Sequence, residues 1–214
     1  VLCQAELPAA MARDGLFPAF LAKAGKKVLV LEQHYVPGGW CHSFMLNGQR
    51  FSPGVHYIGL ADEGSSTSEL YKGLGVANDI VLFRMNKDAF EGCLIGNKKY
   101  TLPAGFDAMG DSLSAEFPNE AKNIKKYLKL VKKVNQQLMY LPTIRGFWQI
   151  LTAPFKTAAF VHNAPFTLKR IIDKHIKNPE LKALLNVQCG DHGLPPDKAG
   201  FLLHCAVMGH YAEG

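Results

Sequence analysis

A short apolar segment that ends in an acidic residue constrains this chain more than any other feature. Residues 28–31 are consecutively apolar, two lysines precede them and Glu32 follows. Four apolar residues in a row are typical of a strand covered on both faces, as in a parallel sheet. Residues 22–25 before it are typical of a helix end, because Gly25 can adopt the left-handed conformation. The segment therefore predicts a helix followed by a buried strand.

Glu32 and the glycine pair after it indicate one half of a dinucleotide site. A carboxylate at the carboxyl end of such a strand accepts hydrogen bonds from an adenosine ribose. Gly38 and Gly39 follow at a spacing that suits a second approach of the backbone to a pyrophosphate. The alternatives are a solvated glutamate at a strand end and a plain glycine turn.

Residues 1–20 do not supply the other half of that site. A dinucleotide site needs a strand, a G-x-G-x-x-G turn and a helix whose N-terminus faces the pyrophosphate. Residues 1–20 contain one glycine, Gly15, and no apolar strand longer than two residues, and Pro8 and Pro18 interrupt them. We therefore expect no working phosphate loop in this segment.

Composition indicates a globular protein and sets limits on its partners. The chain is 48% hydrophobic and 20% charged, with a net charge of +6 and a pI of about 9.0. This basic excess permits a phosphate or lipid partner without requiring one, and we expect no nucleic acid. There is no run of 18 apolar residues, so no spanning helix is expected. Five cysteines without a CxxC pair argue against a disulfide framework or a zinc site.

Turn residues predict several local elements. An Asn-Gly pair at 47–48 predicts a hairpin over residues 44–51, and a Gly-Asn pair predicts another over residues 90–102. Residues 80–85 are typical of a strand. Between these, Ser66 or Ser68 is expected to cap a short helix that Gly73 and Gly75 close.

Two helices are predicted over residues 106–116 and 119–141, and the second is strongly amphipathic. Either the basic face of this helix is solvated and keeps a soluble domain soluble, or it lies against anionic lipid. Its apolar face consists of Ile124, Tyr127, Leu128, Val131, Val134 and Leu138, and its basic face of Lys122, Lys125, Lys126, Lys129, Lys132 and Lys133.

Residues 141–168 combine many aromatic residues with few charges. Prolines at 142, 154 and 165 exclude one long helix. Three interpretations stay open: a cap that lines a substrate site, an interfacial contact with a membrane, and an ordinary helical core with kinks.

The remaining polar residues give weaker indications, and no catalytic residue is identified. Cys41 and His42 are adjacent, but no acid that would orient such a nucleophile–base pair is evident. Asp191 and His192 beside glycines give a weak indication of a cavity. Four histidines do not share metal-ligand spacing, so no metal site is predicted: His56, His192, His204 and His210.

Three segments resemble the carotenoid and retinoid oxidoreductases, a family that includes phytoene desaturases, carotenoid isomerases and retinol saturases. They are residues 21–44, residues 51–59 and residues 190–196, and the likeness extends over roughly residues 20–214. The resemblance implies an α/β fold: a partial Rossmann-like FAD-binding fold, with its first strand and glycine-rich turn degenerate, and a largely helical substrate or cap region.

On that basis the chain divides into an atypical segment 1–20, a partial FAD-binding domain 21–85 and a truncated substrate or cap domain 86–214 that begins with a hairpin. The resemblance implies FAD as the cofactor and NAD or NADP as the hydride donor. It places Glu32 at the ribose, Gly38 and Gly39 at the pyrophosphate with Ser43 nearby, and Gly54, Val55, His56 and Tyr57 beside the isoalloxazine.

The activity implied is saturation of a double bond of a lipophilic polyene such as all-trans-retinol. Carotenoid cis–trans isomerisation, desaturation and non-catalytic binding of a lipophile by a fragment are the alternatives. Because retinoids and carotenoids partition into membranes, a peripheral membrane surface is an expected partner. The implied location is the endoplasmic reticulum for a retinol saturase, or a plastid or bacterial membrane or cytoplasm for the other relatives.

Overall fold

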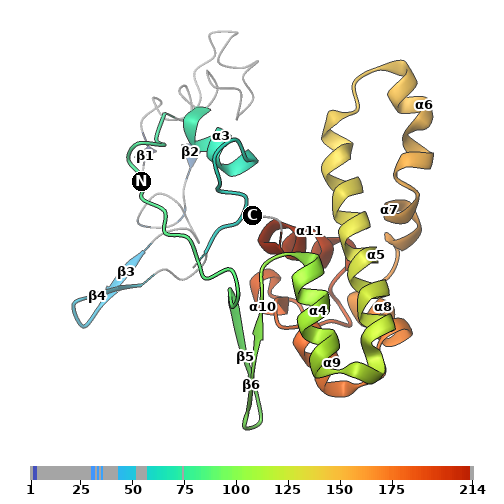
Figure 1. Cartoon of the computed structure of the whole chain (residues 1–214). Helices are drawn as coiled ribbons and strands as arrows, with labels where there is room; N and C mark the ends of the chain where they lie inside the picture. Colours follow the sequence, from blue (N-terminus) through green and yellow to red (C-terminus); the bar gives the residue numbers. More distant parts are fainter. Residues whose placement is uncertain are drawn as a thin grey trace. The chain divides into compact units, whose positions relative to one another are not determined.

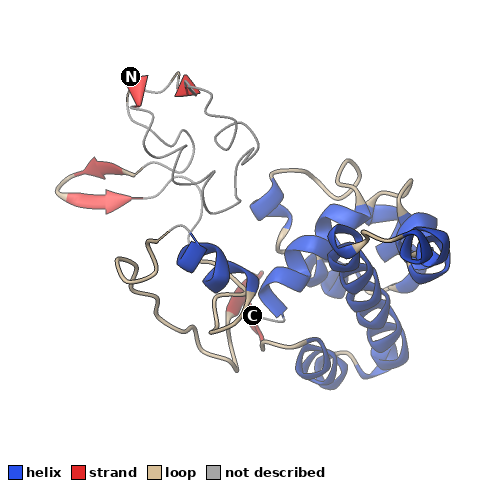
Figure 2. Ribbon diagram, turned by 90° about the horizontal axis from the view of Figure 1, so that it is seen from above, coloured by secondary structure: helices blue, strands red, loops and turns tan. Residues whose placement is uncertain are grey.

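The computed structural model describes residues 2–3, 30–31, 33, 35, 43–51, 57–73 and 75–212 of the 214-residue chain. These residues form two compact units, one of residues 1–83 with residue 214 and one of residues 84–213. Figure 2 shows that the described strands are short and that most of the described structure is helical.

The first unit begins with a pair of two-residue strands, β1 (Leu2–Cys3) and β2 (Val30–Leu31). They pair antiparallel, with Leu2 opposite Leu31. All sheets among the described residues are two-stranded and antiparallel, so the parallel pairing predicted for residues 28–31 is not what the described part of that segment forms. An apolar run predicts burial, but the direction of its partner strand depends on topology that the run does not encode.

A tight hairpin follows, as its Asn-Gly pair predicts. Strand β3 (Phe44–Leu46) pairs antiparallel with β4 (Gln49–Phe51). Asn47 has φ 51° and Gly48 has φ 76°, and a type I′ turn needs positive φ at both positions. The rings of Phe44 and Phe51 stack with centroids 5.6 Å apart across the non-turn end of the hairpin.

The short helix α3 (Ser66–Gly73) ends at its predicted glycines. Gly75 has φ 74°, and its N–H donates to the Lys72 carbonyl at 3.0 Å. The N–H of Val76 donates to the Tyr71 carbonyl at 3.1 Å. These two bonds form a Schellman motif, which satisfies carbonyl groups that the helix end leaves free.

Two predictions near this helix are wrong. Helix α3 begins at Ser66, so neither Ser66 nor Ser68 precedes it as a cap. Residues 80–85 form no strand, and Val81 and Phe83 are 76% and 87% exposed. A strand needs a partner strand for its backbone groups, and no strand among the described residues pairs with this segment.

The second unit opens with the other predicted hairpin, β5 (Glu91–Ile95) and β6 (Lys98–Leu102), which turns at Gly96 with φ 60°. The rest is helical (Figure 1). The elements are α4 (Phe106–Glu116), the 3-10 turn Pro118–Glu120, α5 (Ala121–Tyr140), the 3-10 turn Leu141–Thr143, α6 (Phe147–Lys156), α7 (Ala158–Asn163), α8 (Leu168–His175), α9 (Pro179–Leu185), α10 (Cys189–His192) and α11 (Phe201–Ala212).

Helix α5 is the centre of this unit's core, and its predicted amphipathic pattern is confirmed. It packs against both α4 and α11. Leu138 is half-buried, and the remainder of its predicted apolar face is almost fully buried: Ile124, Tyr127, Leu128, Val131 and Val134. On the opposite face Lys125 pairs with Asp111 at 2.8 Å and Lys132 with Asp107 at 3.7 Å. The apolar face of α5 is therefore covered by protein.

Candidate functional site

Most residues expected at the nucleotide lie outside the described residues: Glu32, Gly38, Gly39, Gly54, Val55 and His56. Two are described. Ser43 is exposed and directly precedes β3, and Tyr57 is half-buried. The described geometry therefore brings none of these residues together, and their placement around a nucleotide stays a prediction.

The chain turns sharply between α5 and α6. The Gln149 side chain stabilises the start of α6. Its Oε1 accepts hydrogen bonds from the backbone N–H groups of Arg145 and Gly146, at 2.9 and 3.1 Å. Pro154 lies inside α6, and the chain bends to α7 at Thr157, whose hydroxyl donates to the Ala153 carbonyl at 2.7 Å. Residues 141–168 therefore form several short helices, as their prolines predict.

Helix α6 exposes its apolar residues. All ten of its residues are described, and none is buried. The interpretation of this segment as an ordinary helical core is therefore wrong for α6. Because exposed aromatic clusters of this kind mark interaction surfaces, we name these residues the apolar tip: Phe147 (73% exposed), Trp148 (73%), Ile150 (61%), Leu151 (55%) and Phe155 (85%).

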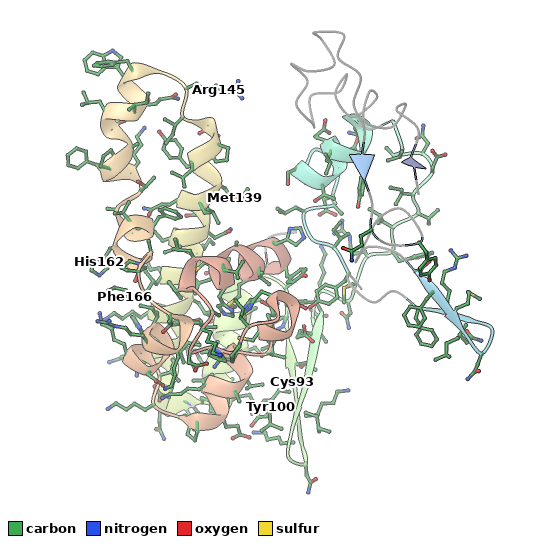
Figure 3. The ribbon with its side chains drawn as sticks, turned by 180° about the vertical axis from the view of Figure 1, so that it is seen from behind. Cys93, Tyr100, Met139, Arg145, His162 and Phe166 are labelled. Carbon is green, nitrogen blue, oxygen red and sulfur yellow. The ribbon has the colours of Figure 1, made fainter. Side chains whose placement is uncertain are left out.

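The apolar tip lies in a part of the chain whose charged residues are all basic. Figure 3 shows Arg145 at the turn between α5 and α6, with the half-exposed Met139 below it on α5. Every charged residue between Glu120 and Asp173 is a lysine or an arginine. Among the described residues, no helix is both long and apolar enough to cross a membrane.

A second cluster lies between α10 and α11. Cys189 and His192 are the two ends of the single-turn helix α10, and His204 comes from α11. Their potential ligand atoms all lie within 4.8 Å of one another. The two imidazole centroids are 6.0 Å apart, with the rings 84° to each other. The spacing of His192 and His204 along the chain does not predict that their rings meet, and the structure brings the two rings together.

Local structure explains how this cluster forms. Gly193, with φ 66°, ends α10, and its N–H donates to the carbonyls of Cys189 and Gly190 at 3.0 and 3.3 Å. The chain then leads into α11. The N–H of Phe201, the first residue of α11, donates to the Phe166 carbonyl at 3.0 Å and fixes the start of the helix. This connection places the buried face of α11 against α10.

Burial keeps two groups of this cluster neutral, the His204 imidazole and the Cys189 thiol. Burial, and then the neighbouring His192, lower the pKa of His204 to about 4. Burial also raises the pKa of the Cys189 thiol. At neutral pH the cluster therefore presents a neutral buried imidazole and a protonated thiol.

A hollow of about 360 Å³ lies on the surface of the same unit. Asp173 forms ion pairs there with Lys169 and, at 2.5 Å, with Lys182. The hydrogen bonds from Lys169 and then Lys182 lower the pKa of Asp173. The acidic side chain of Asp173 is therefore already paired with two lysines. Its lining is Lys169, Ile172, Asp173, Lys182, Asn186, Pro196 and Asp197.

Comparison with known proteins defines the class of the first unit. A family described as NAD(P)-binding Rossmann-like domain matches residues 16–74. This range contains every residue that the resemblance places at the nucleotide, from Glu32 to Tyr57. The segment is therefore Rossmann-like at the level of its family, and the unit carries a dinucleotide-binding type of domain.

The chain as a whole is related to retinoid and carotenoid oxidoreductases. It is 32% identical to all-trans-retinol 13,14-reductase of Macaca fascicularis, over 92% of this chain and 34% of that protein. It is 33% identical to an inactive all-trans-retinol 13,14-reductase of Danio rerio, over 58% of this chain and 21% of that protein. Prolycopene isomerase of Daucus carota is 24% identical, over 79% of this chain and 28% of that protein.

These matches confirm the family resemblance and set its extent. The chain spans about a third of the length of the retinol reductases that it matches. No solved structure matches the chain.

Proposed function

We propose that this protein is an FAD-dependent oxidoreductase that saturates a double bond of a lipophilic conjugated polyene, with all-trans-retinol as the substrate type. The observation that carries the proposal is the similarity to retinol 13,14-reductases along 92% of the chain. That similarity includes both the dinucleotide-binding segment and the helical unit, so it extends beyond a shared nucleotide fold.

The donor set of the first unit fits the ribose and diphosphate of FAD chemically. Glu32 would supply a carboxylate for ribose hydroxyls, and the Gly38–Gly39 backbone would supply N–H groups without a Cβ. Ser43 is exposed, so its hydroxyl is accessible to a bound phosphate. When bound, FAD in its reduced form would supply the hydride for reduction of the double bond, and NADH or NADPH would reduce the flavin again.

We further propose that the apolar tip contacts an anionic membrane surface from which the polyene is taken. Trp and Phe side chains are favoured at the membrane interface, and neighbouring cations are attracted to anionic headgroups. Arg145 precedes α6 and Lys156 is its last residue, and no acidic residue lies in the surrounding sequence to oppose this attraction. The protein is then peripheral, at the endoplasmic reticulum if its activity is that of the retinol reductases.

Anaerobic incubation of the chain with all-trans-retinol and chemically reduced FAD tests the activity. The proposal predicts a product heavier by two hydrogens and with a shorter conjugated system, detected by chromatography and mass spectrometry. Release of unmodified retinol while the protein holds reduced FAD would contradict it. A product of unchanged mass from a cis-carotenoid would instead support isomerisation, the activity named for the Daucus carota relative.

Non-catalytic binding of a lipophile is the second candidate, and the inactive Danio rerio relative favours it. It predicts saturable binding of retinol, measured by quenching of tryptophan fluorescence, with no change in retinol mass and no bound flavin. Mass spectrometry of the bound retinoid separates the two candidates directly.

Vesicle sedimentation tests the membrane contact. The double variant Phe147→Ser/Phe155→Ser should remove most binding to vesicles that contain phosphatidylserine. Val81→Ser/Phe83→Ser is the matched control, because it also removes two exposed apolar residues, from a segment outside the apolar tip. Equal loss in both variants, or equal binding of the wild type to phosphatidylcholine alone and to anionic vesicles, would contradict the proposed surface.

A further inference from the structure

We infer that Cys189, His192 and His204 form a zinc-binding site between α10 and α11. The sulfur and the imidazole nitrogens of these residues lie within 4.8 Å of one another, which is the size of a cluster that can close around one ion. The inference rests on the second unit alone and does not depend on the proposed oxidoreductase activity.

The unpaired imidazole nitrogens are the first support for a bound ion. Both ring nitrogens of His192 and both of His204 are buried and have no hydrogen-bond partner among the described residues. His204 is completely buried, so solvent does not compensate its nitrogens. Buried polar atoms in native proteins almost always have a partner. A metal ion bound by one nitrogen of each ring would give each ring one partner.

The donor set indicates which ion. One thiolate and two imidazoles are borderline-soft ligands that suit Zn²⁺, whereas Mg²⁺ and Ca²⁺ prefer oxygen. Three protein ligands leave the fourth tetrahedral position for water. Binding replaces the Cys189 S–H bond with an S–Zn bond and releases the proton to solvent, so the raised pKa of the thiol is overcome by the ion's charge.

The surroundings of the cluster fit such a site. Cys189 and His192 are three residues apart on one turn of helix, so their side chains lie on one face. Gly190 and Asp191 between them are exposed, and the site is therefore close to the surface. Zinc would tie α10 to α11.

Zinc titration of the full chain in competition with a chromophoric chelator tests the inference. After removal of metal, the chain should bind one equivalent of Zn²⁺. Cys189→Ser and His192→Gln should each weaken the affinity by roughly 100-fold or more, since even outer partners of a ligand account for about 10-fold to 100-fold. Cys93→Ser and His162→Gln are matched controls outside the cluster and should bind zinc within about twofold of the wild type.

Substitution of zinc by Co²⁺ gives a test that does not depend on the folding of the variants. The wild-type chain should show tetrahedral d–d bands and a thiolate-to-cobalt charge-transfer band, and Cys93→Ser should keep both. Failure of the wild type to bind one equivalent, absence of the charge-transfer band, or equal zinc affinity in Cys189→Ser and Cys93→Ser would each overturn the inference.

Discussion

At the scale of single residues, the buried carboxylate of Glu120 connects two distant parts of the helical unit. It is 7% exposed, and one of its oxygens accepts hydrogen bonds from the backbone N–H groups of Lys177 and Asn178 at 2.8 and 2.9 Å. The other oxygen accepts from Asn123 Nδ2 at 2.7 Å. Asn178 in turn caps α9, because its Oδ1 accepts from the N–H groups of Glu180 and Leu181. Glu120 therefore fixes the start of α9 against the start of α5.

Replacement of Glu120 should destabilise the protein measurably. Glu120→Ala leaves two backbone N–H groups without an acceptor, so the free energy of unfolding in urea at pH 7 should fall by about 1–3 kcal/mol. Glu116→Gln is the control, because Glu116 forms an exposed ion pair with Lys98 and should change stability by less than about 1 kcal/mol. Equal effects of the two substitutions would contradict this role.

The same residue predicts how stability depends on pH. The hydrogen bond from Asn123, and then those from Asn178 and Lys177, lower the pKa of Glu120 below 4.5 despite its burial. The contribution of Glu120 is therefore complete above the unfolded-state pKa and is lost as pH falls through the folded-state pKa. Between about pH 5 and about pH 3 the wild type should lose more stability than Glu120→Gln, and parallel urea curves for the two proteins would contradict this.

The cluster of Cys189, His192 and His204 shows what sequence reasoning misses at this scale. The Cys-x-x-His spacing of Cys189 and His192 on one helical turn is a local indication of a metal site, but it is not a CxxC pair. His204 stands twelve positions after His192, and only the packing of α11 against α10 brings them together. Such a contact depends on the tertiary packing of the two helices, so the spacing of the residues along the chain does not predict it.

At the scale of elements, the close contact of α5 and α11 depends on a glycine. A Cβ on Gly209 would lie 2.1 Å from Cγ and Nδ2 of Asn135, a buried residue of α5. Gly209→Ala should therefore destabilise the protein by about 1–3 kcal/mol in thermal or urea unfolding, although alanine favours helices.

Two further variants separate this contact from helix propensity. Gly190→Ala adds a Cβ in open space, so it should leave stability unchanged or raise it by up to about 1 kcal/mol. Adding Asn135→Ala to Gly209→Ala should recover part of the loss, because contacting residues couple. A Gly209→Ala protein as stable as the wild type would show that the helices do not approach as described.

The elements that the sequence predicts well are those specified by nearby residues. The two hairpins follow from the dihedral needs of their turns, at Asn47–Gly48 and at Gly96. Helix α5 follows from its period, since one face is continuously apolar. The wrong predictions depend on distant parts of the chain. Residues 80–85 pair with no strand in the described part of the chain, and an aromatic composition like that of α6 occurs in buried and in exposed helices alike.

At the scale of the whole molecule, all core residues of the described part belong to one unit. The buried hydrophobic residues lie between Tyr100 and Ala212. A fragment of residues 84–213 should therefore keep its helical circular dichroism and unfold in a single cooperative transition. A fragment that lacks a cooperative transition, under conditions in which the whole chain has one, would show that this core depends on the remaining residues.

At this scale, the fold class could be predicted from the sequence. The family match over residues 16–74 agrees with the Rossmann-like assignment that Glu32, Gly38 and Gly39 support, and the mostly helical second unit agrees with a cap-like region. The placement of those three residues around a nucleotide is the central prediction of the account.

Equilibrium binding of FAD to the 214-residue chain tests that prediction most directly. The account predicts saturable binding, seen as a change in flavin absorbance, that Glu32→Gln weakens by about tenfold or more, since the loss of a charged hydrogen bond is about 1.5–3 kcal/mol. Glu63→Gln, a substitution in an exposed loop, should bind FAD as the wild type does. No saturable binding of FAD, or equal affinity in both variants, would contradict the account.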